Sequence, residues 1–229
     1  TEGERISSVL QVNEFSGDKF VVMATANGTI KKTVLSHYSK PRKVGLRAVD
    51  LVEGDTLVGT AVVDGTKDIM LFSTEGKAVR FSESDVRASG RSSRGVRGMR
   101  LPDGEQVISL VIPEADGYLL TVCTNGYGKR TPVADYPTKG RGGKGMIAIK
   151  ASERNGPMVG ALQLHAGNEV MLISDQGTMV RIRGDEIRLV SRVTQGVIVI
   201  RLRENEKLVR IARIVEPYEE DAEYEDNPE

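Results

Sequence analysis

The sequence contains one cysteine, Cys123, two histidines and no tryptophan among its 229 residues. A single cysteine cannot build a disulfide framework within the chain. No apolar run approaches the roughly 18 residues of a transmembrane helix. The sequence also opens without the charged and then apolar leader of a signal peptide. From these absences we expect a protein of the reducing cytoplasm with no membrane partner.

Residues suited to catalysis or metal binding are equally sparse. His37 and His165 lie in different parts of the chain, and Cys123 falls within an apolar run, so they show no metal-ligand spacing and no nucleophile–base pairing. Acidic residues such as Glu83 and Asp85 flank basic stretches, where we expect them to orient arginines. We therefore expect neither an enzyme nor a cofactor in this chain.

Aromatic residues make up only 4% of the sequence. The few tyrosines and phenylalanines are not interleaved with basic residues into a stacking platform, which argues against binding of single-stranded nucleic acid.

The formal net charge of zero conceals an asymmetry. Residues 216–229 contain eight acidic and no basic side chains, so residues 1–215 hold 32 bases against 24 acids. We expect residues 218–229 to form an acidic disordered tail, because a segment so polar and so uniformly charged cannot bury a core. A basic body indicates a polyanionic partner.

A unit of about fifty residues recurs four times. Turn glycines at 28, 76, 126 and 177 and second glycines at 45, 95, 145 and 196 keep the same spacing. Alternating apolar segments begin at 6, 57, 107, 158 and 208. Fixed periods of this length are typical of repeat architectures. We expect one domain, residues 1–217, with repeats near 5–54, 55–104, 105–155 and 156–205 and the first strand of a fifth at 206–216.

The local pattern of each unit is that of β-strands. Short apolar runs of β-formers end at X-Gly pairs, and Asn27-Gly28 and Asn125-Gly126 predict hairpins with type I′ turns. Four strands per fifty residues predict an all-β, propeller-like array of four-stranded blades. Stacking as a solenoid is the alternative, and the spacing does not decide between a closed ring and a spiral.

Basic residues recur at fixed places in the repeat. Four residues after each turn glycine stand Lys32, Arg80, Arg130 and Arg181, with Lys31 and Lys129 beside two of them. We expect these cations to form an arc that follows the phosphates of duplex DNA. A second basic set precedes or adjoins the second glycines: Lys40, Arg42, Lys43, Arg87, Arg91, Arg94, Arg97, Lys139, Arg141, Lys144, Arg188 and Arg192.

The stretch Lys139-Gly140-Arg141-Gly142-Gly143-Lys144-Gly145 is the densest part of this second set. Its glycines, Gly142 and Gly143 among them, let the backbone approach a phosphate and offer N–H groups beside the charged side chains. A nucleotide-binding P-loop is not indicated, since a glycine follows the lysine where Ser or Thr belongs.

Several segments together resemble the C-terminal domain of DNA gyrase A, a DNA-wrapping β-pinwheel. The resemblance covers residues 1–217 and is carried by residues 23–33, 125–131, 93–101 and 194–198. The family's heptapeptide Gln-Arg-Arg-Gly-Gly-Lys-Gly matches here only from Arg141 to Gly145. Because that heptapeptide normally lies in a first blade, we expect such a blade outside this chain. The related C-terminal domain of topoisomerase IV and a protein-interaction propeller remain alternatives.

The resemblance implies a non-catalytic domain that binds and bends double-stranded DNA around a basic rim. It further implies an ATP- and Mg²⁺-dependent holoenzyme, a type II DNA topoisomerase that introduces negative supercoils. The partners implied are the N-terminal cleavage domain of gyrase A and the gyrase B protein, in the bacterial cytoplasm at the nucleoid.

Overall fold

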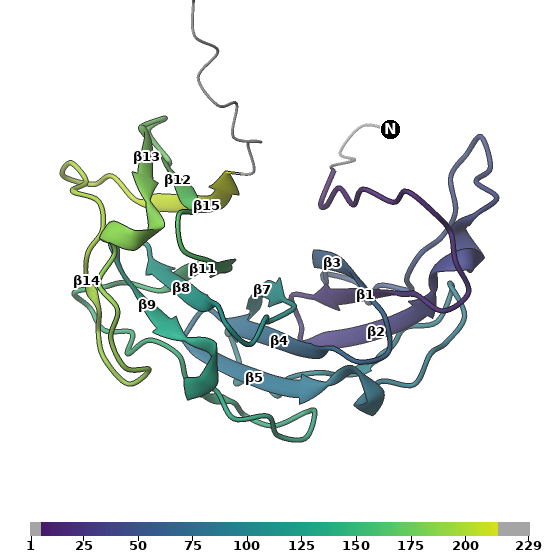
Figure 1. Cartoon of the computed structure of the whole chain (residues 1–229). Coiled ribbons are helices and arrows are strands. Elements are labelled where there is room, and N and C mark those ends of the chain that lie inside the picture. The colour runs from purple at the N-terminus through teal and green to yellow at the C-terminus, as the bar shows by residue number, and fades with distance from the viewer. Residues whose placement is uncertain (1–5, 215–229) are drawn as a thin grey trace, which may run out of the picture.

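The computed structural model describes residues 6–214, which form four small antiparallel sheets arranged along an arc (Figure 1). The predicted all-β, propeller-like array of blades is therefore confirmed. The first sheet contains β1 (Phe20–Thr25), β2 (Thr29–Val34), β3 (Leu57–Val63) and β6 (Val96–Arg97). The second contains β4 (Asp68–Ser73), β5 (Lys77–Ser82), β7 (Val107–Val111) and β10 (Met146–Ile147).

The third sheet contains β8 (Tyr118–Cys123), β9 (Tyr127–Pro132), β11 (Met158–Leu164) and β14 (Val197–Ile198). The fourth contains β12 (Glu169–Ser174), β13 (Met179–Arg183) and β15 (Leu208–Ile214). A 3₁₀ turn follows each hairpin: η1 (Leu35–Tyr38), η2 (Glu83–Asp85), η3 (Val133–Asp135) and η4 (Gly184–Glu186). None of the helices among residues 6–214 is long and apolar enough to cross a membrane.

Each of the first three blades is assembled from three separate parts of the chain. A hairpin supplies the two central strands, and the next long strand, such as β3, pairs with the inner side of that hairpin. A two-residue strand from beyond the following hairpin, such as β6, pairs with the outer side. The strands β3, β7, β11 and β15 thus lie on the inner side of the arc (Figure 1). Consecutive blades are interlocked by this exchange of strands.

The hairpin turns differ in type from the sequence prediction. Asn27 and Asn125 do not have positive φ, so these turns are not type I′; the glycine alone has it, with φ 82° at Gly28. The Gly28 N–H donates to the Thr25 carbonyl at 3.0 Å. This is the three-residue hairpin loop in which glycine takes the left-handed position.

Glycine is also required at this turn because another part of the chain lies against it. A Cβ at Gly28 would stand 2.6 Å from the Met99 carbonyl oxygen, and one at Gly126 would stand 2.4 Å from that of Ile200. The Gly28 carbonyl accepts hydrogen bonds from the N–H groups of Gly98 and Met99. The turn glycines 28, 76 and 126 therefore mark where the segments after Gly95, Gly145 and Gly196 dock, whereas a Cβ at Gly177 would meet nothing within 4 Å.

The apolar core is divided among the junctions between blades. Ile30 and Val22 of the first hairpin pack with Ile69 and Phe81 of the second. Equivalent clusters join the second blade to the third and the third to the fourth. The array is thus held by nearest-neighbour interfaces, as in other repeat proteins.

The sequence prediction for the two ends of the repeat needs correction. The alternating segment beginning at Ile6 forms no strand, since residues 6–19 are irregular. The strand at 208–214 pairs with β12 and completes the fourth sheet instead of opening a fifth. The repeat boundaries within 1–217 stay a prediction, and the acidic segment 218–229 lies outside the described residues.

Candidate nucleic-acid interface

Three of the four cations that stand four residues after the turn glycines, Lys32, Arg80 and Arg130, extend from their hairpins to the 3₁₀ turn of the following blade. Lys32 Nζ donates to the Glu83 carbonyl at 2.7 Å and lies 3.7 Å from its carboxylate. Arg130 donates to the Ile187 carbonyl and to an Asp185 carboxylate oxygen, each at 2.8 Å. Both cations are buried. They stabilise the contact between blades.

Arg80 and Arg181 occupy the same place in the repeat. Arg80 donates to the carbonyls of Val133 and Tyr136 at 3.2 and 2.9 Å, again in the next blade, and to Asp68 in its own. Arg181 donates to Glu169 on the neighbouring strand. The predicted set is therefore brought to equivalent positions, with each guanidinium or ammonium already bonded within the protein.

Lys31 and Lys129 are still more enclosed, with 1% and 0% of their surface exposed. Burial, with a smaller effect of the nearby Arg91 and Arg192 charges, lowers the pKa of each lysine to about 8. Their ammonium groups donate to backbone carbonyls beneath the second basic set.

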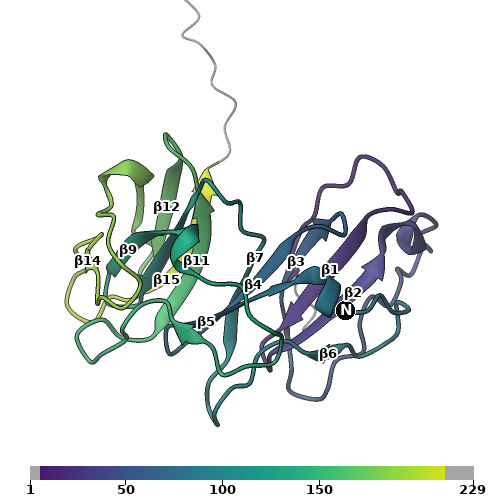
Figure 2. The ribbon, with the colours of Figure 1, turned by 60° about the horizontal axis from the view of Figure 1, so that its bottom comes forward.

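The second basic set lies on four segments that we call the outer loops: residues 39–45, 87–95, 137–145 and 188–196. The last three lead into β6, β10 and β14, the outermost strands of the first three sheets (Figure 2). Most of their cations are exposed and two are half-buried, Arg91 and Arg192; the exposed members are Lys40, Arg42, Lys43, Arg87, Arg94, Lys139, Arg141, Lys144 and Arg188. Arg97, on β6, is exposed as well.

Backbone hydrogen bonds connect each of the last three outer loops to the segment that follows the preceding second glycine. The N–H groups of Asp50, Arg100 and Lys150 donate to the carbonyls of Ser93, Gly143 and Thr194 at 3.2, 2.9 and 3.0 Å. We call the four outer loops and the segments 46–50, 95–100, 145–150 and 196–201 the outer strip. These bonds make it continuous from the first blade to the fourth.

The glycine-rich loop 139–145 is attached to this strip by its neighbours. The Gly142 N–H donates to the Gly98 carbonyl at 2.8 Å, and Arg141 donates to the carbonyls of Arg97 and Asp85 at 2.6 and 3.1 Å. In the described part of the chain, the N–H groups of Gly143 and Lys144 have no intramolecular acceptor. These two donors and the exposed Lys144 side chain are suited to one phosphate group.

A hollow of about 420 Å³ lies between the loop 87–95 and β2. Ile30 and Lys31 contribute to its lining from the hairpin, and Arg87, Ser89 and Arg94 from the loop. Arg94 is bonded to the Asp50 carboxylate, and the Ser89 hydroxyl lies 2.7 Å from that of Ser93. Among the described residues, this leaves the Arg87 guanidinium as the donor at the hollow that is suited to an anion.

Sequence reasoning missed three exposed cations of the outer strip. Arg100, Lys150 and Arg201 each stand five residues after a second glycine and are exposed. Because the N–H groups of Arg100 and Lys150 bond to the next outer loop, their side chains start beside it. The signal was present in the sequence, since three of the four repeats carry a base at this position.

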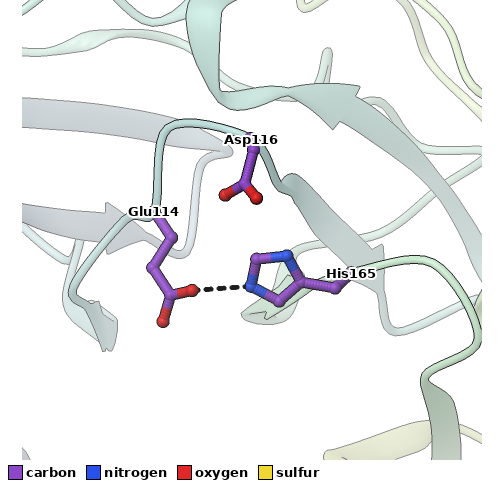
Figure 3. Close-up of side chains that lie close together, drawn as sticks. All are labelled: Glu114, Asp116 and His165. Atoms are coloured by element: carbon purple, nitrogen blue, oxygen red, sulfur yellow. Dashed lines mark hydrogen bonds and ion pairs between the residues drawn. The ribbon is translucent and has the colours of Figure 1, made fainter.

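The structure also brings His165 to two carboxylates that are far away in sequence. His165 Nε2 lies 2.8 Å from Glu114 Oε2, and Asp116 lies alongside (Figure 3). The two acids precede β8 and His165 precedes β12, so the contact joins loops of neighbouring blades. All three side chains are at least partly exposed, and the hydrogen bond joins two of them, His165 and Glu114.

The repeat matches a known family along its whole length. The model of the DNA gyrase C-terminal domain, a beta-propeller, matches residues 19–64, 67–114, 117–164 and 168–214. The chain belongs to this family. It is 52% identical over 220 residues to the DNA gyrase A protein of Escherichia coli, a match that covers 96% of the chain. It is 50% identical over 226 residues to the DNA gyrase A protein of Pseudomonas aeruginosa, covering 94% of the chain.

These matches cover 25% and 24% of the two relatives, so the chain spans about a quarter of their length. A solved DNA gyrase A C-terminal domain aligns with a TM-score of 0.84 at 24% identity, covering 94% of this chain and 72% of that one. A topoisomerase IV C-terminal domain aligns at 0.83 and 24% identity, covering 89% and 64%. The two structures confirm the fold alike, and the sequence relatives favour gyrase.

Proposed function

We propose that this chain is a non-catalytic domain that binds double-stranded DNA and bends it along the outer strip. The continuity of that strip carries the proposal, since hydrogen bonds join the cation-bearing segments of consecutive blades. The residues expected to contact phosphates are the exposed cations, and the missed Arg100, Lys150 and Arg201 are added to them. The name that the relatives share, DNA gyrase A, agrees with a DNA partner.

Contacts of this kind would be made to the DNA backbone and not to base edges. Lysines and arginines on exposed loops fix a duplex in place through its phosphates, which carry no sequence information. Bending 20 to 30 base pairs by 40 to 90° costs on the order of 1–6 kcal/mol, so several phosphate contacts are needed to offset it. The outer strip supplies cations from every blade.

The cations bonded within the protein take a supporting part in this proposal. Lys31, Lys32, Arg80, Lys129 and Arg130 hold the blades and loops in position. Phosphate contacts are assigned instead to exposed cations of the outer strip: Arg42, Lys43, Arg94, Arg97, Lys139, Arg141 and Lys144, with the half-buried Arg91 and Arg192 behind them and Gly142 and Gly143 shaping their loop. Arg94 also bonds to Asp50 and Arg141 to the Arg97 and Asp85 carbonyls, whereas Arg181 lies on β13, outside the strip.

The wider enzyme is proposed from the family. This domain would wrap DNA beside the N-terminal cleavage domain of gyrase A and the gyrase B protein, at the bacterial nucleoid, to support negative supercoiling. ATP and Mg²⁺ would act in those other parts. In the described residues the glycine-rich loop leads into β10 and not into a helix, which does not fit a nucleotide phosphate cradle.

Ligation of a nicked circular plasmid in the presence of this chain tests the proposal. We expect increasing protein to shift the linking-number distribution in one direction, with a smaller shift at higher salt because phosphate contacts release counterions. A variant with Arg100, Lys144 and Lys150 changed to glutamine is expected to lose most of the shift. An unshifted distribution at protein concentrations that saturate the plasmid would refute bending of a fixed hand.

A further inference from the structure

Two lysines lie beneath the outer loops, although the sequence predicted that they contact DNA. Lys31 on β2 and Lys129 on β9 stand three residues after their turn glycines, and both are buried. The equivalent positions of the second and fourth repeats are Val79 and Val180. The buried ammonium is therefore present in alternate repeats only.

Each ammonium is bonded to the backbone of an outer loop. Lys31 Nζ donates to the carbonyl of Arg91 and to that of Ala48. Lys129 Nζ donates to the carbonyl of Ser191 at 2.8 Å and to that of Arg192. Among residues 6–214, no carboxylate forms an ion pair with either lysine.

A buried ammonium without a carboxylate depends on hydrogen bonds for its stability. Three of the four acceptors are outer-loop carbonyls and the fourth is that of Ala48 in the segment 46–50, so each loop must keep its conformation for the charge to be satisfied. Only 1% of Lys31 and 0% of Lys129 is exposed, so neither ammonium stands at the protein surface, although Lys31 contributes to the lining of the hollow beside the loop 87–95.

We propose that Lys31 and Lys129 are positioning residues for DNA binding, each fixing one arginine-bearing outer loop from beneath without touching phosphate. This inference rests on the proposed function. It assigns to Lys31 the loop 87–95, with Arg87 and Arg94, and to Lys129 the loop 188–196.

The glycine-rich loop 137–145 serves as an internal comparison. It lies over β5, where Val79 replaces the lysine, and it is attached through backbone bonds such as that from Lys139 N–H to the Arg80 carbonyl at 2.8 Å. Removal of either lysine leaves these bonds in place.

Amide hydrogen exchange of the free chain tests the positioning role without DNA. In Lys31→Met we expect exchange at residues 88–94 to rise by about tenfold, while residues 138–144 and 190–195 stay as in the wild type. Lys129→Met should raise exchange at 190–195 alone. Val79→Met, which introduces the same side chain at the matching position, is the control and should change neither loop. Unchanged loop exchange, or an equal rise in all three loops, would overturn the proposal.

NMR of the wild-type ammonium groups provides a second measurement that does not depend on the variants folding. Buried, hydrogen-bonded ammonium groups exchange slowly with water, so Lys31 and Lys129 should give resolved signals. A 30-base-pair duplex should leave these signals unmoved while it shifts the backbone signals of Arg87 and Arg94. Movement of the lysine signals comparable to that of the arginines would indicate direct contact and overturn the inference.

DNA affinity separates this inference from the function on which it rests. If the wild type binds duplex DNA, Lys31→Met should weaken binding by about three- to tenfold. The control variant Val79→Met should bind the duplex with the affinity of the wild type. Wild-type affinity in a variant whose loop exchanges faster would refute the positioning role. If the variants exchange faster in their loops but the wild type binds no duplex, the proposed function is refuted. The contacts between the lysines and the loops are then still established.

Discussion

Lys31 and Lys129 make the stability of the protein depend on pH. Burial lowers the pKa of both lysines to about 8, whereas an unfolded lysine titrates near 10.4. Between these values the unfolded chain binds more protons, so the free energy of unfolding rises with pH. This gain in the free energy of unfolding is absent below about pH 8 and complete above about pH 10.4. We expect each lysine to contribute about 1–3 kcal/mol to it.

Urea unfolding of the wild type and of Lys31→Met at pH 7, 8, 9 and 10 measures this contribution. The wild type should gain stability relative to the variant as the pH rises from 8 to 10. The comparison cancels Cys123, whose pKa burial raises to about 12 and which therefore destabilises the fold in alkali in both proteins. A difference between the two proteins that does not change with pH would contradict a buried ammonium.

Residue identity and spacing predicted which cations share a place in the repeat, but not what they contact. Lys32 and Arg130 were expected to follow DNA, yet their partners Glu83 and Asp185 stand 51 and 55 residues further along the chain. Strand alternation decides which face of the sheet a side chain occupies, and this follows from the sequence. The exchange of strands between blades decides which residues cover that face, and this is seen only in the structure.

At the scale of elements, the short donated strands depend on the second glycines. Gly95 has φ 99°, and a Cβ there would lie 2.6 Å from the Ile30 carbonyl oxygen, against which β6 is packed. We expect Gly95→Ala to lower the free energy of unfolding by about 2–4 kcal/mol, because it combines a strained backbone with a close backbone contact. Exchange at the amides of β2 that face β6 should rise.

Gly90 of the same loop supplies the matched control. A Cβ at Gly90 would meet nothing within 4 Å, and its φ lies outside the left-handed region. Gly90→Ala should therefore stay within about 1 kcal/mol of the wild type. Equal losses in the two variants would show that β6 docking does not require the glycine.

The sequence predicted the elements better than their partners. Hairpins were expected at Asn27-Gly28 and Asn125-Gly126 and are present, although the asparagines do not take the positive φ of a type I′ turn. Long strands were expected at 57, 107, 158 and 208 and are present too. Each of them completes the sheet of the preceding hairpin, and the repeat spacing alone does not reveal this exchange.

For the whole molecule, the repeated packing of neighbouring blades sets both the arrangement of the apolar clusters and the arrangement of the exposed cations. Each blade packs on its neighbours through its own cluster, so the same relation between blades is repeated along the arc. The outer loops 87–95, 137–145 and 188–196 follow this relation because backbone hydrogen bonds attach each of them to the hairpin of the blade before it. Consecutive loops therefore lie next to one another, so a duplex that contacts one loop and follows the outer strip would contact the next.

The salt dependence of the binding constant measures how many phosphates of such a duplex the protein contacts. If about eight phosphates are neutralised, the logarithm of the binding constant should fall with the logarithm of salt concentration with a slope of about −7. Changing Lys144 and Lys150 to glutamine should reduce the slope by about 1.8 for duplexes of any sequence, since each phosphate contact contributes about 0.9. Arg210 and Arg213 are exposed on the inner strand β15, so the matching double change there should leave the slope unaltered. If the inner pair reduced the slope as much as the outer pair, the DNA would not follow the outer strip.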